Sequence, residues 1–247
     1  MKPLLLTILA SCIAFSSLAG IELSGIQAKI DQAQTEAFKT QDTEAIDAII
    51  ESLEDTDNPS GTHLADYWTA YAYYQKAVYH AFGEKSEKEA MAAIKAGKKI
   101  IIDLGASRNS EDFALLTNLQ SISLQYVQGM KIMAESGAAE DWAEMAMQAG
   151  PNNPRAFFVA GQYDFYKPAF VGGGKKAEKL LTKALELYKE EIVNPALPSW
   201  GFADTYAILA QMHAEKQPEK AAVLVAEGLE RFPDHYGLLE VQQELSK

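Results

Sequence analysis

Cysteine is nearly absent from this chain of 247 residues: the single cysteine is Cys12, so no disulfide can form within the chain. Basic residues are also scarce, because 22 lysines and arginines stand against 34 aspartates and glutamates, which gives a net charge of −12. Nucleic acids and anionic membrane surfaces are bound by a surplus of lysine and arginine, so this balance argues against both as partners. Apolar runs outside the N-terminus are short, and the N-terminal run is too short for a spanning helix. The remaining composition, 48% hydrophobic and 23% charged, is typical of a soluble globular protein.

Motifs for catalysis and metal binding are missing as well. The four histidines stand singly, without His-x3-His or HExxH spacing. The acidic stretch 51–57 lacks the glycine and the terminal glutamate of a calcium loop. No Gly-x-Ser-x-Gly elbow occurs, and the only cysteine falls in the N-terminal segment. The sequence therefore predicts a protein that is not an enzyme and that needs no cofactor or metal.

The first 19 residues have the order of a secretory signal peptide. Lys2 supplies a positive start, residues 3–18 are apolar or small, and Ser17-Leu18-Ala19 fits a small-x-small cleavage site. Cleavage after Ala19 would leave one mature domain, residues 20–247, in the periplasm or outside the cell, where a chain without cysteine suits the oxidising conditions. A competing interpretation is a lipoprotein, because Leu9-Ala10-Ser11-Cys12 resembles a bacterial lipobox, in which Cys12 would carry a lipid anchor.

The rest of the chain carries a repeat built on small residues. Alanine is followed by a small or apolar residue at +4, by another at +7 and, in two copies, by proline at +12. The alanine markers are Ala45, Ala90, Ala139, Ala177 and Ala221. In the first copy, Ala45 is followed by Ile49 and Ser52. Offsets of 4 and 7 lie on one face of an α-helix, where small side chains let a neighbouring helix approach closely.

This pattern resembles the tetratricopeptide repeat (TPR) family, which has Trp-x2-Leu-Gly-x2-Tyr in a first helix, Ala-x3-Phe-x2-Ala in a second and a closing proline. The resemblance covers about residues 22–247 and implies an all-α solenoid of about five helix pairs plus a C-terminal capping helix. The markers are 38 to 49 residues apart, more than the 34 of the family, so the helices are longer or the turns carry inserts. Helices are predicted near 22–39, 43–54, 62–82, 86–103, 110–134, 138–149, 154–166, 173–190, 200–215, 218–231 and 235–246.

Three successive glycines, Gly172-Gly173-Gly174, stand between two of these predicted helices. A phosphate loop needs Gly-x4-Gly-Lys-Ser/Thr after a strand, whereas here Lys176 follows the Gly-Lys pair and a helix precedes it. The glycines are therefore interpreted as a turn that uses positive φ angles. An aromatic helix followed by Pro168, Phe170 and the three glycines is similar to an exported bacterial subgroup of TPR proteins.

Aromatic side chains crowd two of the predicted first helices. Successive helical residues are about 100° apart, so these side chains cannot all face one way. Residues 67, 71, 74 and 78 form a stripe that is predicted to be core, and Gly161 is predicted to pack inward. Five side chains fall off the inward stripes and are predicted to line the hollow of the superhelix, with packing in the core as the alternative: Tyr73, Phe158, Gln162, Phe165 and Tyr166.

These features favour an exported, non-enzymatic binding protein. In a curved stack of helix pairs, side chains of the first helices would bind an extended peptide or a partner's helix, as in a scaffold or interaction module. The alternative is a small-ligand-binding periplasmic protein, since TPR lipoproteins accompany some bacterial solute-uptake systems. A deep cavity with aromatic walls would favour the small ligand, and an open groove with a polar rim would favour the peptide.

Overall fold

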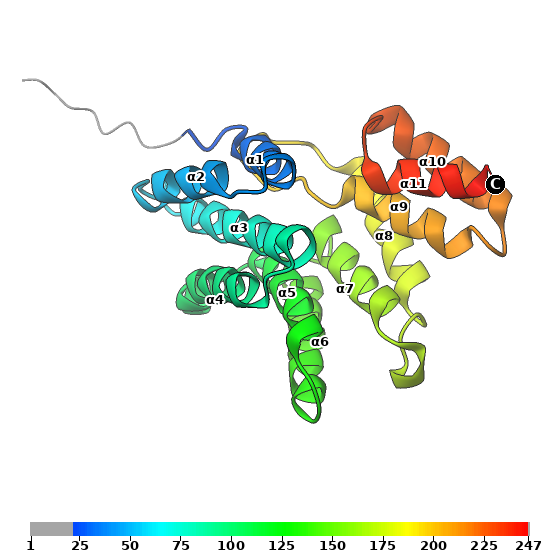
Figure 1. Ribbon diagram of the computed structural model, residues 1–247, viewed down its shortest axis with the longest axis horizontal. Coiled ribbons are helices and arrows are strands. Elements are labelled where there is room, and N and C mark those ends of the chain that lie inside the picture. Colours follow the sequence, from blue (N-terminus) through cyan, green and yellow to red (C-terminus); the bar gives the residue numbers. More distant parts are fainter. Residues whose placement is uncertain (1–21, 247) are drawn as a thin grey trace, which may run out of the picture.

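The computed structural model describes residues 22–246, and this part of the chain is α-helical without a β-strand (Figure 1). Its α-helices are α1 (Ile26–Thr40), α2 (Glu44–Glu54), α3 (Leu64–Val78), α4 (Glu87–Asp103), α5 (Ser110–Ser123), α6 (Lys131–Ala149), α7 (Pro154–Tyr166), α8 (Ala177–Glu190), α9 (Phe202–His213), α10 (Pro218–Arg231) and α11 (Tyr236–Leu245). Each odd-numbered helix from α1 to α9 packs on the helix that follows it, and α11 packs on α9 and α10. The predicted all-α solenoid of five helix pairs with a C-terminal capping helix is confirmed. Within the described residues, no helix is both long and apolar enough to cross a membrane.

The small-residue repeat forms the contact between paired helices. Four of the five marker alanines have no exposed surface: Ala90, Ala139, Ala177 and Ala221. The first unit departs from the prediction, because Ala45 is exposed and Ile46, Ile50 and Leu53 are buried instead. The three larger side chains remove more apolar surface from water, so they set the buried face of α2 one residue further on.

The predicted helix over 110–134 is wrong, because the chain turns between α5 and α6. A 3-10 turn, Leu124–Tyr126, follows α5, and α6 begins at Lys131. Gly129 has a φ of 64°, in the left-handed region that glycine enters most easily. A second irregularity follows α3, where a π-helical segment, Tyr79–Glu84, continues the helix.

The three glycines form a tight turn that leads into α8. Gly172 and Gly174 have φ angles of 92° and 76°, and a Cβ on Gly173 would lie 1.8 Å from the Lys167 carbonyl oxygen. The backbone N–H of Gly174 donates to the Asp164 carbonyl at 2.7 Å. The Asp164 carboxylate accepts from the Lys176 and Ala177 N–H groups at 2.7 and 2.8 Å, which satisfies donors at the start of α8.

The connection between α8 and α9, residues 191–201, crosses to the first two helix pairs (Figure 1). The Pro195 carbonyl accepts from the Gly25 N–H at 2.7 Å, and the Ala196 carbonyl accepts from Trp68 Nε1 at 3.1 Å. Further along, Trp200 Nε1 donates to the Tyr67 hydroxyl at 2.9 Å. This connection therefore ties the fourth pair to α1 and α3 and places Trp200 beside the concave side of the solenoid.

Candidate ligand-binding site

The first helix of every pair contributes side chains to a hollow that consists of two adjoining cavities. The smaller has a volume of about 480 Å³ and the larger about 1020 Å³. Both are lined by Tyr74 and Val78 of α3, Asn118 of α5 and Gln162 of α7. The two cavities therefore meet at a shared boundary in the middle of the stack.

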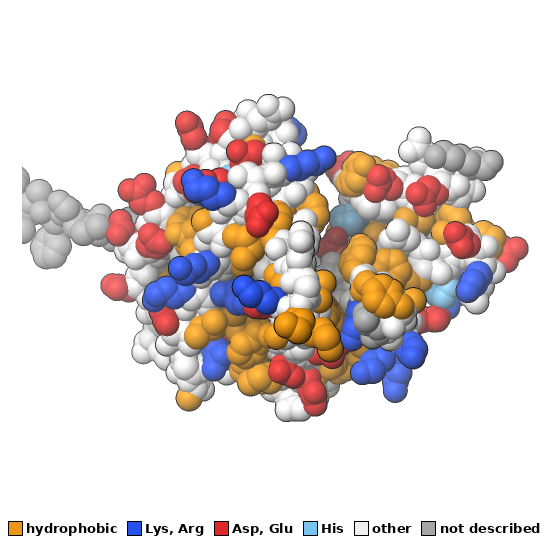
Figure 2. All heavy atoms as spheres, turned by 60° about the horizontal axis from the view of Figure 1, so that its bottom comes forward, with side chains coloured by type: hydrophobic (Ala, Val, Ile, Leu, Met, Phe, Trp, Pro, Cys, Tyr) orange, Lys and Arg blue, Asp and Glu red, His pale blue; other side chains and the backbone are white. Residues whose placement is uncertain are grey.

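The larger cavity is walled mostly by apolar side chains. Val78, Ile122, Leu124, Ile132 and Tyr163 are among its lining residues. Several large side chains at this cavity stay exposed in the free protein: Phe82, Met133, Tyr166 and Phe170. Hydrophobic side chains also gather around a hollow on the face shown in Figure 2. Contiguous apolar surface of this kind is typical of a binding site.

Irregular backbone brings two of these exposed side chains to the larger cavity. Phe82 lies in the π-helical segment after α3, and Phe170 lies in a 3-10 turn just ahead of the three glycines. Phe170 is 89% exposed although it lines the cavity. An ion pair joins two of the lining residues, Lys167 and Glu140, so the charge at this edge is balanced.

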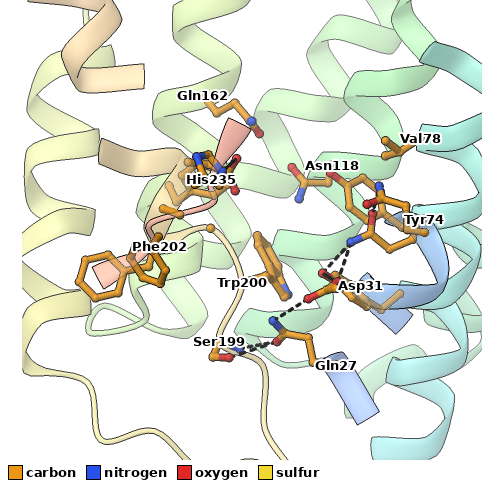
Figure 3. A pocket seen from close by; sticks show the side chains of 18 residues that line it. Gln27, Asp31, Tyr74, Val78, Asn118, Gln162, Ser199, Trp200, Phe202 and His235 are labelled. Carbon is orange, nitrogen blue, oxygen red and sulfur yellow. Dashed lines mark hydrogen bonds and ion pairs between the residues drawn. The ribbon is translucent and has the colours of Figure 1, made fainter. Parts of the chain in front are cut away.

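The smaller cavity is polar on the side of α1, where Asp31 is held by three donors (Figure 3). Its carboxylate accepts from the Tyr71 hydroxyl at 2.8 Å, from Gln75 Nε2 at 3.0 Å and from Gln27 Nε2 at 3.3 Å. Burial raises the pKa of Asp31 above its ordinary value, and the three hydrogen bonds oppose that shift. The position of this carboxylate is thus fixed by its partners.

A second carboxylate, Asp204 of α9, faces the same cavity. His235 Nε2 lies 3.3 Å from Asp204 Oδ1, and both residues are part of the lining. Burial raises the pKa of the Tyr74 hydroxyl, and the negative charges of Asp204 and Asp31 raise it further. Among the described residues, neither a lysine nor an arginine lines this cavity, so its ionic character is acidic.

Aromatic rings form another wall of the smaller cavity, around Trp200 (Figure 3). The Trp200 ring stacks on Tyr71, with centroids 6.3 Å apart and an interplanar angle of 19°. Phe158 meets Trp200 edge to face at 6.1 Å. The indole is also held by its hydrogen bond to Tyr67, so this wall is preformed.

The structure places three of the five predicted hollow residues at the two cavities. Phe158, although only 2% exposed, lines the smaller cavity, Tyr166 lines the larger one, and Gln162 lines both. Tyr73 and Phe165 line neither cavity.

The two exceptions are explained by their contacts. The Tyr73 hydroxyl donates to Glu54 Oε1 at 3.1 Å, and the Tyr73 Cβ would lie 3.2 Å from a Cβ on Gly97 of α4, so Tyr73 belongs to the packing against α2 and α4. Phe165 is partly buried and packs against the hydrophobic core, with its ring edge to face on Tyr166 at 4.9 Å. The predicted cleavage site Ala19 and the alternative lipid site Cys12 lie outside the described residues.

Sequence reasoning missed most of the polar lining. Tyr67 and Tyr71 of the predicted core stripe are buried and Tyr74 packs against the core, but Tyr74 and Val78 also border both cavities. Asp31, Asn118, Trp200 and His235 were not singled out. Asn118 did carry a signal, because it is an amide inside the apolar run 113–119. Among residues 22–246, no three histidine, cysteine, aspartate or glutamate side chains gather as a metal site would require.

No protein-family model matches this chain, and no curated protein matches its sequence. Two solved structures are similar to it. TTC0263, a thermophilic TPR protein in Thermus thermophilus, has a TM-score of 0.60 at 14% identity, over 90% of this chain and 98% of its own. The HusA haemophore from Porphyromonas gingivalis has a TM-score of 0.55 at 24% identity, over 78% of this chain and 94% of its own. These likenesses establish a TPR-like helical fold.

Proposed function

We propose that this protein binds a bulky, largely apolar small molecule in the larger cavity of its hollow. The observation that carries the proposal is the cavity itself, about 1020 Å³ in volume and walled by apolar side chains of α3, α5, α6 and α7. Concave, mostly apolar sites with a few polar groups are the usual form of small-molecule sites. The protein would act by binding and not by catalysis.

The similarity to a haemophore supports tetrapyrroles as the first ligand class to test. The mature chain, residues 20–247, would be titrated with haemin and with metal-free protoporphyrin IX, and binding would be followed by the Soret band and by tryptophan fluorescence. Saturable one-to-one binding of either compound supports the class. If neither binds, native mass spectrometry of the protein from its own cells would show whether another small molecule is carried. A protein without any such molecule would contradict the proposal.

A partner's helix or an extended peptide is the second candidate. The observation that favours it is the exposed apolar rim of the larger cavity, which includes Phe82, Met133 and Phe170. An amphipathic helix can place apolar side chains at i, i+3 and i+4 into such a groove. The test is to capture a defined protein segment with this protein and to measure whether the segment competes with the small molecule for binding. Competition would place both ligands in the same cavity.

Export to the periplasm or out of the cell belongs to the same proposal and rests on the first 19 residues. We expect the native mature chain to begin at Gly20 or close to it, because Ser17-Leu18-Ala19 fits the cleavage pattern. N-terminal sequencing and intact-mass measurement of the native protein would test this. A lipid-modified Cys12 at the new N-terminus would contradict it and support an anchored protein.

Filling the larger cavity should abolish ligand binding without loss of stability. Gly137 lies on α6 and lines this cavity, and a Cβ there would meet nothing within 4 Å. Gly137→Phe should therefore place a ring in the cavity, lower ligand affinity at least about tenfold and leave the melting temperature unchanged or higher, because glycine is a poor helix former.

The matched control is Gln148→Phe, which adds the same ring to an exposed position of α6 outside the cavity. Affinity of both variants would be measured by the same titration, and stability by thermal unfolding. Equal affinities in Gly137→Phe and the unmodified protein would show that the ligand binds elsewhere.

A further inference from the structure

The boundary between the two cavities holds polar groups that have no partner in the fold. Asn118 is only 4% exposed, and its carboxamide makes no hydrogen bond to any described residue. The Gln162 carboxamide and the Tyr74 hydroxyl also lack a hydrogen bond within residues 22–246. In Figure 3 the amides of Asn118 and Gln162 point into the space between them. These groups open onto the cavities, where water can satisfy them in the free protein, and a ligand with matching donors and acceptors can take the place of that water.

The charge of the smaller cavity indicates which ligand group fits. Asp31 and Asp204 both act on the Tyr74 hydroxyl, and Asp204 also acts on Asp31. Within the described part of the chain, the only titratable side-chain nitrogens in the lining are those of His235, beside Asp204. Two carboxylates that face one cavity without a lysine or arginine repel an anion and attract a cation.

The aromatic wall suits the same ligand. Trp200 and Tyr74 line the cavity, and the face of an aromatic ring attracts a cation that has left water. The carboxamide oxygens of Asn118 and Gln162 can accept hydrogen bonds from N–H groups of an organic cation. Such hydrogen bonds are shorter and stronger when the donor is charged. The carboxylates, the aromatic ring faces and the free carboxamide oxygens thus all favour an organic cation that carries N–H groups.

We propose that the smaller cavity is a binding site for an organic cation with N–H donors, such as a primary ammonium group on an apolar body. The ammonium would lie between Asp204, Asn118 and Gln162, with its carbon chain against Trp200. This site adjoins the larger cavity at Asn118 and Gln162, and it is set apart by the carboxylates and the aromatic wall of the smaller cavity.

Three probes of nearly equal shape test the charge requirement: 4-phenylbutylammonium, 4-phenylbutanol and 4-phenylbutanoate. Calorimetric titration of the mature protein should give a dissociation constant at least about tenfold lower for the ammonium than for the alcohol, and no detectable binding of the carboxylate. Higher salt should weaken ammonium binding. Equal or tighter binding of the alcohol or the carboxylate, or no binding of the ammonium, would overturn the proposal.

Asp204→Asn should weaken ammonium binding at least about fivefold and leave any binding of the alcohol unchanged, because it removes charge and keeps the shape of the side chain. Asp141→Asn is the matched control, since Asp141 is exposed on α6, outside both cavities, and the net charge changes equally. Equal weakening by both variants would show that overall charge, and not the cavity, attracts the cation.

Asn118→Leu separates a ligand-binding role from a structural one. Because the amide has no partner in the described fold, the leucine variant should melt at a higher temperature than the unmodified protein while binding the ammonium at least about fivefold more weakly. A lower melting temperature would mean that the amide stabilises the fold. Unchanged ammonium affinity would mean that Asn118 is not part of the site.

Discussion

Arg155→Ala is expected to lower the free energy of unfolding by about 3–5 kcal/mol, because it leaves two carboxylates without their buried cation. Arg155 on α7 is 4% exposed. Its Nε donates to the Glu111 carboxylate at 2.8 and 3.0 Å, and its Nη1 donates to Glu191 at 3.1 Å. The guanidinium thus joins α5 and α7 to the residue that follows α8. Urea-induced unfolding of the purified variant measures the loss.

The pH dependence of this loss has a definite sign. Burial raises the pKa of Glu111 above its ordinary value, and Arg155 opposes that shift, so the pKa should climb further in the variant. A carboxyl whose pKa is higher in the folded state than in the unfolded state takes up a proton on folding. Its contribution to stability therefore falls as the pH rises from the pKa in the unfolded state to the pKa in the folded state. The deficit of Arg155→Ala should be larger at pH 8 than at pH 5.

Lys189→Ala is the control for Arg155→Ala. Its ammonium pairs with Glu227 at 2.9 Å, but both side chains are almost half exposed, so the loss should stay below about 1 kcal/mol. An Arg155→Ala variant that loses no more than this control, or whose deficit does not change with pH, would contradict the account of a buried ionic cluster.

The fold was largely predictable because each repeat carries small residues at fixed spacings on one face of a helix. Ala90, Ala139, Ala177 and Ala221 mark helices whose inner face must be narrow, and a spacing of four and seven residues has one simple explanation. Residue size does not mark the buried face where small and large apolar residues lie side by side. In α2, alanines and isoleucines are neighbours in the sequence. The buried face consists of Ile46, Ile50 and Leu53, and it does not include Ala45.

The break between α5 and α6 was missed for a related reason. Residues 110–134 contain no proline, and Gly129 alone was not read as a turn. The turn matters for the larger cavity because it allows α6 to start at Lys131 and to present Met133 and Gly137 to that cavity. A helix that continued through 127–130 would leave no such wall.

The candidate site was only partly predictable, because it depends on contacts between residues far apart in the chain. Trp200 reaches the hollow only because the connection after α8 crosses back to α1 and α3, as the bonds from Trp68 to Ala196 and from Trp200 to Tyr67 show. Helical periodicity says which side chains share a face, but not whether a distant loop covers that face. Tyr74 was therefore taken for core, although it borders both cavities.

Gly161→Leu is expected to destabilise the protein by about 2–3 kcal/mol or more, because α7 and α8 are in contact at this glycine. A Cβ on Gly161 would lie 2.7 Å from Leu181 Cγ and 3.1 Å from the Leu181 backbone nitrogen. Leu181 is itself completely buried, so it cannot turn aside into solvent, and relief requires the two helices to move apart. Thermal and urea-induced unfolding would both report the loss.

Gly137→Leu provides the matched control, since both variants exchange a helical glycine for leucine and gain the same helix propensity of about 1 kcal/mol. Gly137 has open space around it, so the gain should appear there as added stability, whereas at Gly161 the steric conflict should outweigh it. The difference between the two variants therefore isolates the cost of separating α7 from α8. If both variants were stabilised alike, the close approach of these helices at Gly161 would be contradicted, and with it the role of small residues in pairing them.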